Sequence, residues 1–427
     1  MNTTILFVAL VVAVLLYVPI AFAIGIGCSL IAVFTSDISI RTIFSGLYTS
    51  GDQFALLAVP FFILAGDIMA SCGISRRLVN LAKTLIGHVT GGMGMVTVIA
   101  CMFFAAISGS GVATAAAVGG IMIPILKQDN YKDEFSTALV STASAVGPII
   151  PPSVPMIILG ILCSISVTDL FIAGVVPGVL ISLALMVAVG IISRRRGYGQ
   201  KREKASWKER LRAIWDAKFS IIMPVIILGG IYSGMFTPTE ASVVACAYSL
   251  VIGLFVYREI KLRDLVPIIG RAARNVGIIM ALLGFAQIFG KVLVLQKVPA
   301  TLAAWVQQLT NSKILVLFVV NIILLIAGMF LETGSAITIL GPLLFAIVTP
   351  YGVKPLHLAI IMIVNLAIGL ATPPVGASLF VSAGISKIPV ERTMKDLLIL
   401  IGVCFAVLLL ITYCEPIVTF LPALLKR

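Results

Sequence analysis

The sequence has few charged residues and no long polar stretch. Asp, Glu, Lys and Arg make up only 11% of its 427 residues, whereas soluble domains carry roughly 25%. Hydrophobic residues make up 60%, and the mean hydropathy is +1.17. Apolar runs of about 20 residues, long enough to cross a bilayer, recur along the whole chain. These features exclude a water-soluble globule and predict a single all-α, multi-pass membrane domain over residues 1–427.

Histidine and cysteine are too few and too scattered to build a metal or haem site. The two histidines, His88 and His357, stand alone, and the seven cysteines form no C-x-x-C pair. We expect free cysteines that act as small buried hydrophobes, and no cofactor. An enzyme is not expected either. A serine-nucleophile motif requires a glycine two residues before the serine, and Ser108 stands two residues before Ser110.

The net charge of +13 comes from basic residues in short loops between apolar runs. This pattern orients membrane proteins, with the basic loops in the cytoplasm, so nucleic acid is not an expected partner. The loop from Arg194 to Lys218 holds ten basic and three acidic residues. We therefore expect this loop to be cytoplasmic.

Two apolar runs are too long for single spans. Between Lys83 and Lys127 there is no charged residue, and one helix of that length would be over about 60 Å long, twice the membrane core. The run is interrupted at Ser108-Gly109-Ser110-Gly111 and flanked by basic residues. A second such run, between Lys313 and Lys354, contains one charge, Glu332. Both runs indicate re-entrant hairpins of two half-length helices, at about residues 91–126 and 313–349.

Each predicted hairpin is followed by a span with a proline pair in its middle. The motif G-x-x-x-P-P occurs at Gly147–Pro152 and again, 222 positions later, at Gly369–Pro374. Proline removes a backbone donor and breaks a helix. Freed backbone groups are tolerated in a membrane only where they are buried in protein or line a cavity. We predict two discontinuous spans, at about residues 134–164 and 356–384.

The two halves of the chain share one order of elements, which predicts an internal duplication with repeats at 1–215 and 216–427. Pro19 divides the apolar stretch that begins with an expected span at Ile5, much as Pro238 divides the corresponding stretch of the second half. An odd number of full spans in each half inverts the second half relative to the first. Inverted repeats are typical of secondary transporters.

The hairpin tips and the proline breaks carry the candidate binding groups. Half-helix N-termini favour an anion, while hydroxyl and carbonyl oxygens suit a hard cation. We expect an anionic substrate to contact Ser108, Gly109, Ser110, Ser153, Thr333 and Ser335. We expect sodium, and no other metal, at Ser108, Ser110, Gly147, Pro148, Pro151, Gly328, Glu332, Thr333, Gly369, Thr372 and Val375.

Each of these motifs also has a purely structural interpretation. Small residues at a tip allow helices to pack closely, a proline pair can shape a helix without binding an ion, and Glu332 can simply cap a helix. Thr237-Pro238-Thr239-Glu240 has the pattern of a capping box, which is sufficient to explain Glu240.

Several motifs together resemble the large M subunit of tripartite ATP-independent periplasmic (TRAP) transporters. The resemblance rests on Val59–Gly66, Gly91–Gly94, Ser108–Ser110, Gly147–Ser153, Phe171–Gly174, Phe236–Ala241 and Thr372–Pro374. It implies an elevator-type fold in the bacterial inner membrane and sodium-coupled uptake. It also implies two protein partners, namely a small four-helix Q subunit, expected here as a separate chain, and a periplasmic substrate-binding protein. Substrates in this family are mostly carboxylates such as C4-dicarboxylates, sialic acid and other sugar acids.

The alternative is a stand-alone ion-coupled dicarboxylate symporter of similar architecture. An ABC-type permease is disfavoured by the paired hairpins, and an intramembrane hydrolase lacks a base. Neither predicted tip carries Arg or Lys, so the sequence does not identify which acid is carried.

Overall fold

The computed structural model describes residues 53–200 and 203–425 without a gap, residues 18–34, and a few single positions between 6 and 48. The span expected from Ile5 and the connector before Gln53 therefore lie largely outside the described residues. Every regular element in the described ranges is helical. Nine of these helices are long and apolar enough to cross a membrane. The expected all-α multi-pass architecture is confirmed.

The helices of the first half surround one hairpin and one broken span. In chain order they are α2 (Ile20–Phe34), the 3₁₀ turn η1 (Phe54–Leu57), α4 (Ala58–Ser71), α5 (Ile74–Ile86), α6 (Gly92–Ser108), α7 (Gly111–Gln128), α8 (Asp133–Ser144), α9 (Val154–Leu162) and α10 (Val167–Arg196). Helices α6 and α7 are the two arms of the first predicted hairpin. Helices α8 and α9 are the two pieces of the first broken span.

The second half repeats this order. Its helices are α11 (Trp207–Tyr232), α12 (Pro238–Val251) with the π-helical turn η2 (Ile252–Val256), α13 (Leu262–Leu295), α14 (Val298–Leu309), α15 (Lys313–Phe330), α16 (Thr333–Val348), η3 (Thr349–Tyr351), α17 (Pro355–Gly369), α18 (Ala377–Ser386), α19 (Val390–Tyr413) and α20 (Pro416–Leu425). The second hairpin is α15–α16, and the second broken span is α17–α18. Two hairpins and two discontinuous spans are thus confirmed, while the repeat boundary at residue 215 stays a prediction.

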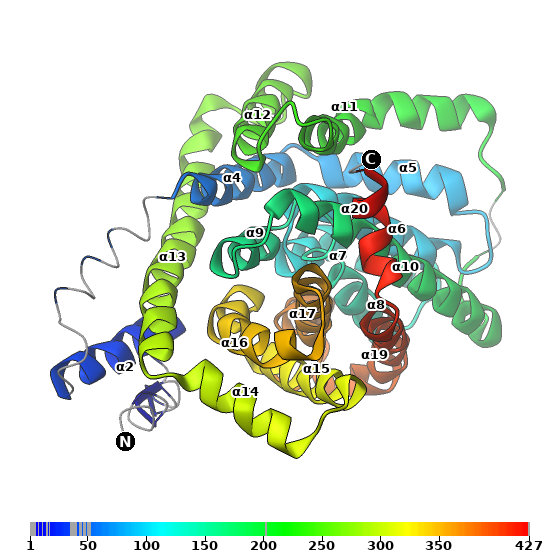
Figure 1. Ribbon diagram of the computed structural model, residues 1–427. Helices are drawn as coiled ribbons and strands as arrows, with labels where there is room; N and C mark the ends of the chain where they lie inside the picture. Colours follow the sequence, from blue (N-terminus) through cyan, green and yellow to red (C-terminus); the bar gives the residue numbers. More distant parts are fainter. Residues whose placement is uncertain are drawn as a thin grey trace.

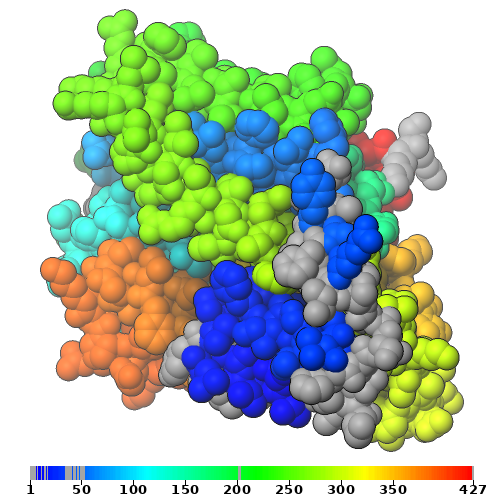
Figure 2. Space-filling model, turned by 90° about the vertical axis from the view of Figure 1, so that its left-hand side faces the viewer, coloured from blue at the N-terminus to red at the C-terminus, as the bar shows by residue number. Residues whose placement is uncertain are grey.

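The helices form a rim and an inner group. Helices α11, α12, α4 and α13 run along two sides of the molecule, and α9, α16 and α17 lie inside them (Figure 1). Helix α13 packs against both α2 and α4. Seen from the side of α13, α2 lies beneath it (Figure 2). Side chains of α2 such as Ile24 and Cys28 form a buried cluster with Phe289 of α13.

The two halves interlock through their broken spans. Helix α9, from the first break, packs against α16 of the second hairpin, and α18, from the second break, packs against α7 and α8 of the first half. Each hairpin therefore packs against the broken span of its own half and against one helix from the broken span of the other half. This crossed packing brings the two hairpin tips toward one another.

Capping hydrogen bonds from nearby side chains stabilise the first turns of several helices. The Thr237 hydroxyl accepts a hydrogen bond from the Glu240 amide at 3.2 Å, and the Thr237 amide donates to the Glu240 carboxylate at 2.8 Å. The capping box expected at Thr237 is confirmed, so Glu240 has a local structural role. Ser206 and Glu209 form a second such box at the start of α11.

Charge placement predicts which ends of the helices face the cytoplasm. In a variant without native cysteines, we expect Lys204→Cys, next to the basic stretch, to react with an impermeant thiol reagent only from the cytoplasmic side. Asn311→Cys, between α14 and α15, should react only from the periplasmic side. Both positions are exposed. Labelling of both from one side would contradict the inverted orientation of the second half.

Candidate substrate and ion site

The first hairpin turns within three residues. Helix α6 ends at Ser108, and Gly109 adopts a left-handed conformation (φ 60°) that a residue with a side chain rarely adopts. Ser110 then caps α7, because its hydroxyl accepts a hydrogen bond from the Ala113 amide at 3.4 Å. The Thr114 hydroxyl donates to the Ser110 carbonyl at 2.7 Å and lies 3.1 Å from the Ser108 hydroxyl. The tip thus gathers three hydroxyl groups at a helix N-terminus.

The second hairpin turns through Leu331, which is extended rather than left-handed, and it has a charged cap. Helix α15 ends at Phe330, and α16 begins at Thr333. The Glu332 carboxylate accepts hydrogen bonds from the Gly334 amide at 2.9 Å and from the Ser335 amide at 3.3 Å. Glu332 stands 222 positions after Ser110, the same spacing as the two proline motifs. Glu332 is thus the N-cap of α16, and its role at a sodium site stays a prediction.

Because glycine has no side chain, the backbone of each tip directly contacts the backbone of the break in the same half. A Cβ atom on Gly147 would lie 2.6 Å from the backbone nitrogen of Gly111, and one on Gly369 would lie 2.6 Å from the Cα of Gly328. Real Cβ atoms are essentially never that close to other atoms. The Gly376 amide also donates to the Met329 carbonyl at 3.3 Å. The sodium ligands predicted at each tip are thus adjacent to those predicted at the break of the same half.

A cavity of about 360 Å³ joins the two tips. The first turn of α7, the first turn of α9 and the first turn of α16 all contribute to its wall. Three helix N-termini therefore face one space, and their amide dipoles favour an anion there. Residues of α4 and α13 line the cavity as well. The volume of the cavity falls within the range of small-molecule sites.

The structure places about half of the predicted site residues on this cavity. Those that line it are Ser108, Gly109, Ser110, Pro148, Glu332, Thr333 and Ser335. The remaining ones do not line it: Gly147, Pro151, Ser153, Gly328, Gly369, Thr372 and Val375. Two of these already have hydrogen bonds, since the Ser153 hydroxyl donates to the Pro148 carbonyl at 2.6 Å and that of Thr372 to the Ile368 carbonyl at 2.8 Å.

One hydroxyl on the cavity has no partner. Thr333 is 1% exposed, and its Oγ1 atom makes no hydrogen bond to any residue that the structure describes. Buried hydroxyls without a partner are rare, because leaving one unsatisfied costs about 1–3 kcal/mol. Thr333 is therefore the strongest candidate at the second tip for a direct ligand. In the described ranges no group of three or more His, Cys, Asp and Glu side chains could hold a metal ion.

Sequence reasoning missed two polar residues on the cavity. Asp67 of α4 and Asn275 of α13 line the cavity. Asp67 is the only charged residue in the apolar stretch Phe54–Ser71. A lone charge at membrane depth marks a functional site by default, so the signal that identifies Asp67 is present in the sequence.

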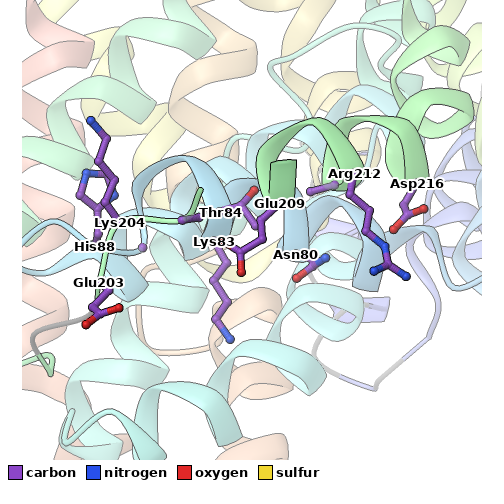
Figure 3. Close-up of a pocket in the computed structure, with 12 residues that line it drawn as sticks. Asn80, Lys83, Thr84, His88, Glu203, Lys204, Glu209, Arg212 and Asp216 are labelled. Atoms are coloured by element: carbon purple, nitrogen blue, oxygen red, sulfur yellow. The ribbon is translucent and has the colours of Figure 1, made fainter. Parts of the chain in front are cut away.

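Two larger hollows lie elsewhere, away from the hairpin tips and the proline breaks. One of about 570 Å³, between α5 and α11, carries Lys83, Lys204 and Arg212 together with Glu203 and Asp216. The side chains of Lys83 and Lys204 point to opposite sides (Figure 3). A neighbouring hollow of about 640 Å³ is lined by α5, α11 and residues near η2. Neither includes a hairpin tip or a proline break.

Comparison with known proteins identifies the family. The profile described as "Tripartite ATP-independent periplasmic transporter, DctM component" matches residues 7–417. The chain belongs to this family. The TRAP resemblance inferred from the motifs is confirmed, and so is a multi-pass location in the bacterial inner membrane.

Curated relatives of this DctM-family chain carry different names. An isethionate TRAP transporter permease protein of Oleidesulfovibrio alaskensis is 43% identical over 94% of this chain, and the match spans 64% of that protein's length. A C4-dicarboxylate TRAP transporter large permease protein of Pseudomonas aeruginosa is 40% identical, covering 93% of this chain and 92% of its own. A sialic acid TRAP transporter large permease protein of Vibrio cholerae is 36% identical, covering 87% of each.

Solved structures show the same fold at low sequence identity. The YdaH transporter of Alcanivorax borkumensis superposes with a TM-score of 0.62 at 13% identity, over 87% of this chain and 88% of that one. MtrF of Neisseria gonorrhoeae superposes with a TM-score of 0.59 at 10% identity, over 87% and 84%. The expected all-helical fold with two hairpins and two discontinuous spans is confirmed.

The glycine contacts predict a sharp difference between glycines. We expect Gly147→Ala and Gly369→Ala each to destabilise the protein by about 1–3 kcal/mol, because the added methyl overlaps backbone that cannot move aside. Gly120→Ala is the matched control, since a Cβ there meets nothing within 4 Å. That variant should be neutral or gain up to about 1 kcal/mol from helix propensity. Thermal unfolding in detergent checks all three, and equal melting temperatures would show that the close approaches are relaxed in solution.

Proposed function

We propose that this chain is the membrane subunit through which a sodium gradient drives uptake of a small organic acid. The observation that carries the proposal is the cavity where both hairpin tips and three helix N-termini meet. The acids named for the relatives, isethionate, C4-dicarboxylates and sialic acid, all bear at least one anionic group. In the proposed pose that group is held by the amide dipoles of α7, α9 and α16.

Sodium supplies the driving force and offsets the negative charge of the acid and of Glu332. We propose one sodium at the first tip, near Ser108, Ser110 and the carbonyls of the first break. A second sodium is proposed at the second tip, near Thr333 and the break that follows Gly369. Hydroxyl and carbonyl oxygens are the ligands that hard cations prefer. The paired positions, with a tip adjacent to a break in each half, support two such sites.

The proposed movement is that of an elevator. The hairpins and broken spans, which interlock through α9–α16 and α18–α7 contacts, would move as one body. Helices α11, α12, α4 and α13 along the rim (Figure 1) would stay in place. Residues of both groups line the cavity, namely those of the tips and those of α4 and α13. A site at that boundary can face either side of the membrane in turn.

Two partners complete the proposed transporter. One is a small four-helix membrane subunit, and the other is a periplasmic binding protein that delivers the acid. Family membership supports both. We expect the chain alone in proteoliposomes to show negligible acid uptake under a sodium gradient, and the complete set of three proteins to show robust uptake. Robust uptake by the isolated chain would favour a stand-alone symporter instead.

Removing a tip hydroxyl should weaken sodium activation without unfolding the protein. For Ser110→Ala and Thr333→Ala we expect the sodium concentration at half-maximal uptake to rise roughly threefold to tenfold, the effect of losing one ligand of hydrogen-bond strength. Ser249→Ala is the matched control, because its buried hydroxyl donates to the Ala245 carbonyl within α12 and lies away from the tips. An unchanged sodium midpoint and Hill slope in both tip variants would overturn the assignment.

A further inference from the structure

The part of the cavity wall that the rim helices supply is polar at two positions. Asp67 lies on α4 and Asn275 on α13. Helix α4 reaches the first tip because Gly66 has no side chain, and a Cβ there would lie 3.5 Å from the Cα of Ser108. Asp67 therefore stands next to the point where the rim touches the hairpin. Its position is fixed by packing.

The Asp67 carboxylate has an acceptor to spare. Its Oδ2 atom is buried and makes no hydrogen bond to any residue in the described ranges. An ionised carboxylate accepts hydrogen bonds and cannot donate them.

The charges on the cavity wall are also one-sided. Two carboxylates, Asp67 and Glu332, line it, and no Lys or Arg side chain does in the part of the chain that the structure describes. Glu332 already accepts two amide hydrogen bonds, whereas Asp67 has an oxygen left over. A second carboxylate on the substrate, placed against Asp67, would meet a like charge, which strongly disfavours binding. A hydroxyl or ammonium group would instead satisfy the free oxygen.

From this geometry we propose that Asp67, with Asn275, selects acids whose end remote from the anionic group carries hydroxyl or ammonium donors. The substrate class is then a hydroxylated or amino monoacid, and a simple dicarboxylate is disfavoured. This inference rests on the proposed function, because the three helix N-termini at the tips must hold the anionic group. Thr333, whose buried hydroxyl is free on the tip side, gives the bound acid a further partner there. Asp67 acts as a specificity residue on the rim wall.

The test compares two acids of equal chain length on the full chain in lipid nanodiscs with sodium. Gluconate carries hydroxyl groups along its chain, and adipate carries a second carboxylate. We expect the wild-type chain to bind gluconate more tightly than adipate. Asp67→Leu should weaken gluconate binding about 10- to 100-fold, the effect of losing a charged acceptor. It should leave adipate binding unchanged or improved.

Two further variants keep the test decisive. Asp67→Asn retains a carbonyl acceptor and should lose less gluconate affinity than Asp67→Leu; it replaces the leucine variant if the latter does not fold. Asp216→Asn, an exposed acid on α11, removes an equal charge away from the cavity and should change neither affinity. Melting temperatures without ligand establish that each variant is folded.

The outcomes separate this inference from the proposed function. Tighter binding of adipate, or unchanged gluconate binding in both Asp67 variants, would overturn the role of Asp67 and leave the acid site at the tips in place. If the wild-type chain binds neither acid and the complete transporter takes up no acid in sodium, both the proposed function and this inference fall.

Discussion

The close approach of each hairpin tip to its own proline break is the constraint on which the rest of the structure depends. At Gly147 and Gly369 the backbones come so near that no side chain fits between them. In a membrane, apolar burial gives little net drive for helices to associate, so close packing at small residues takes over that role. The freed backbone groups of the breaks are thereby shielded from lipid. The same approach brings hydroxyls, carbonyls and helix N-termini to one cavity.

Each hairpin tip has an N-cap side chain at the start of its second helix, but the two caps differ chemically. Ser110 and Glu332 occupy equivalent cap positions, yet one is neutral and the other carries a carboxylate. Each tip lies against the break of its own half, but the group that it presents differs. The cavity is asymmetric for a second reason, because α9 contributes its N-terminus whereas α18 packs away from the cavity against α7 and α8.

Much of this architecture follows from the sequence because its signals are local. The charge-free run around Ser108 and the G-x-x-x-P-P motifs predict hairpins and breaks from length and proline chemistry alone. The crossed packing of α9 on α16 is not predictable in this way, since it depends on contacts between residues far apart in the chain. For Ser153 the structure adds that its hydroxyl caps α9 and donates to the Pro148 carbonyl, while its substrate contact stays a prediction. Asp67 was overlooked because it lies outside both repeated motifs.

The location of Glu332 has an electrical consequence. Glu332 belongs to a hairpin that moves in the proposed elevator cycle, whereas Asp67 belongs to the stationary rim. With Glu332 ionised, the moving side of the empty site carries one negative charge, and two sodium ions with one univalent acid bring the loaded site to neutrality. A membrane potential acts only on charge that moves, at about 2.3 kcal/mol per charge for each 100 mV. A negative interior would therefore assist the return of the empty carrier and leave the loaded step nearly voltage-independent.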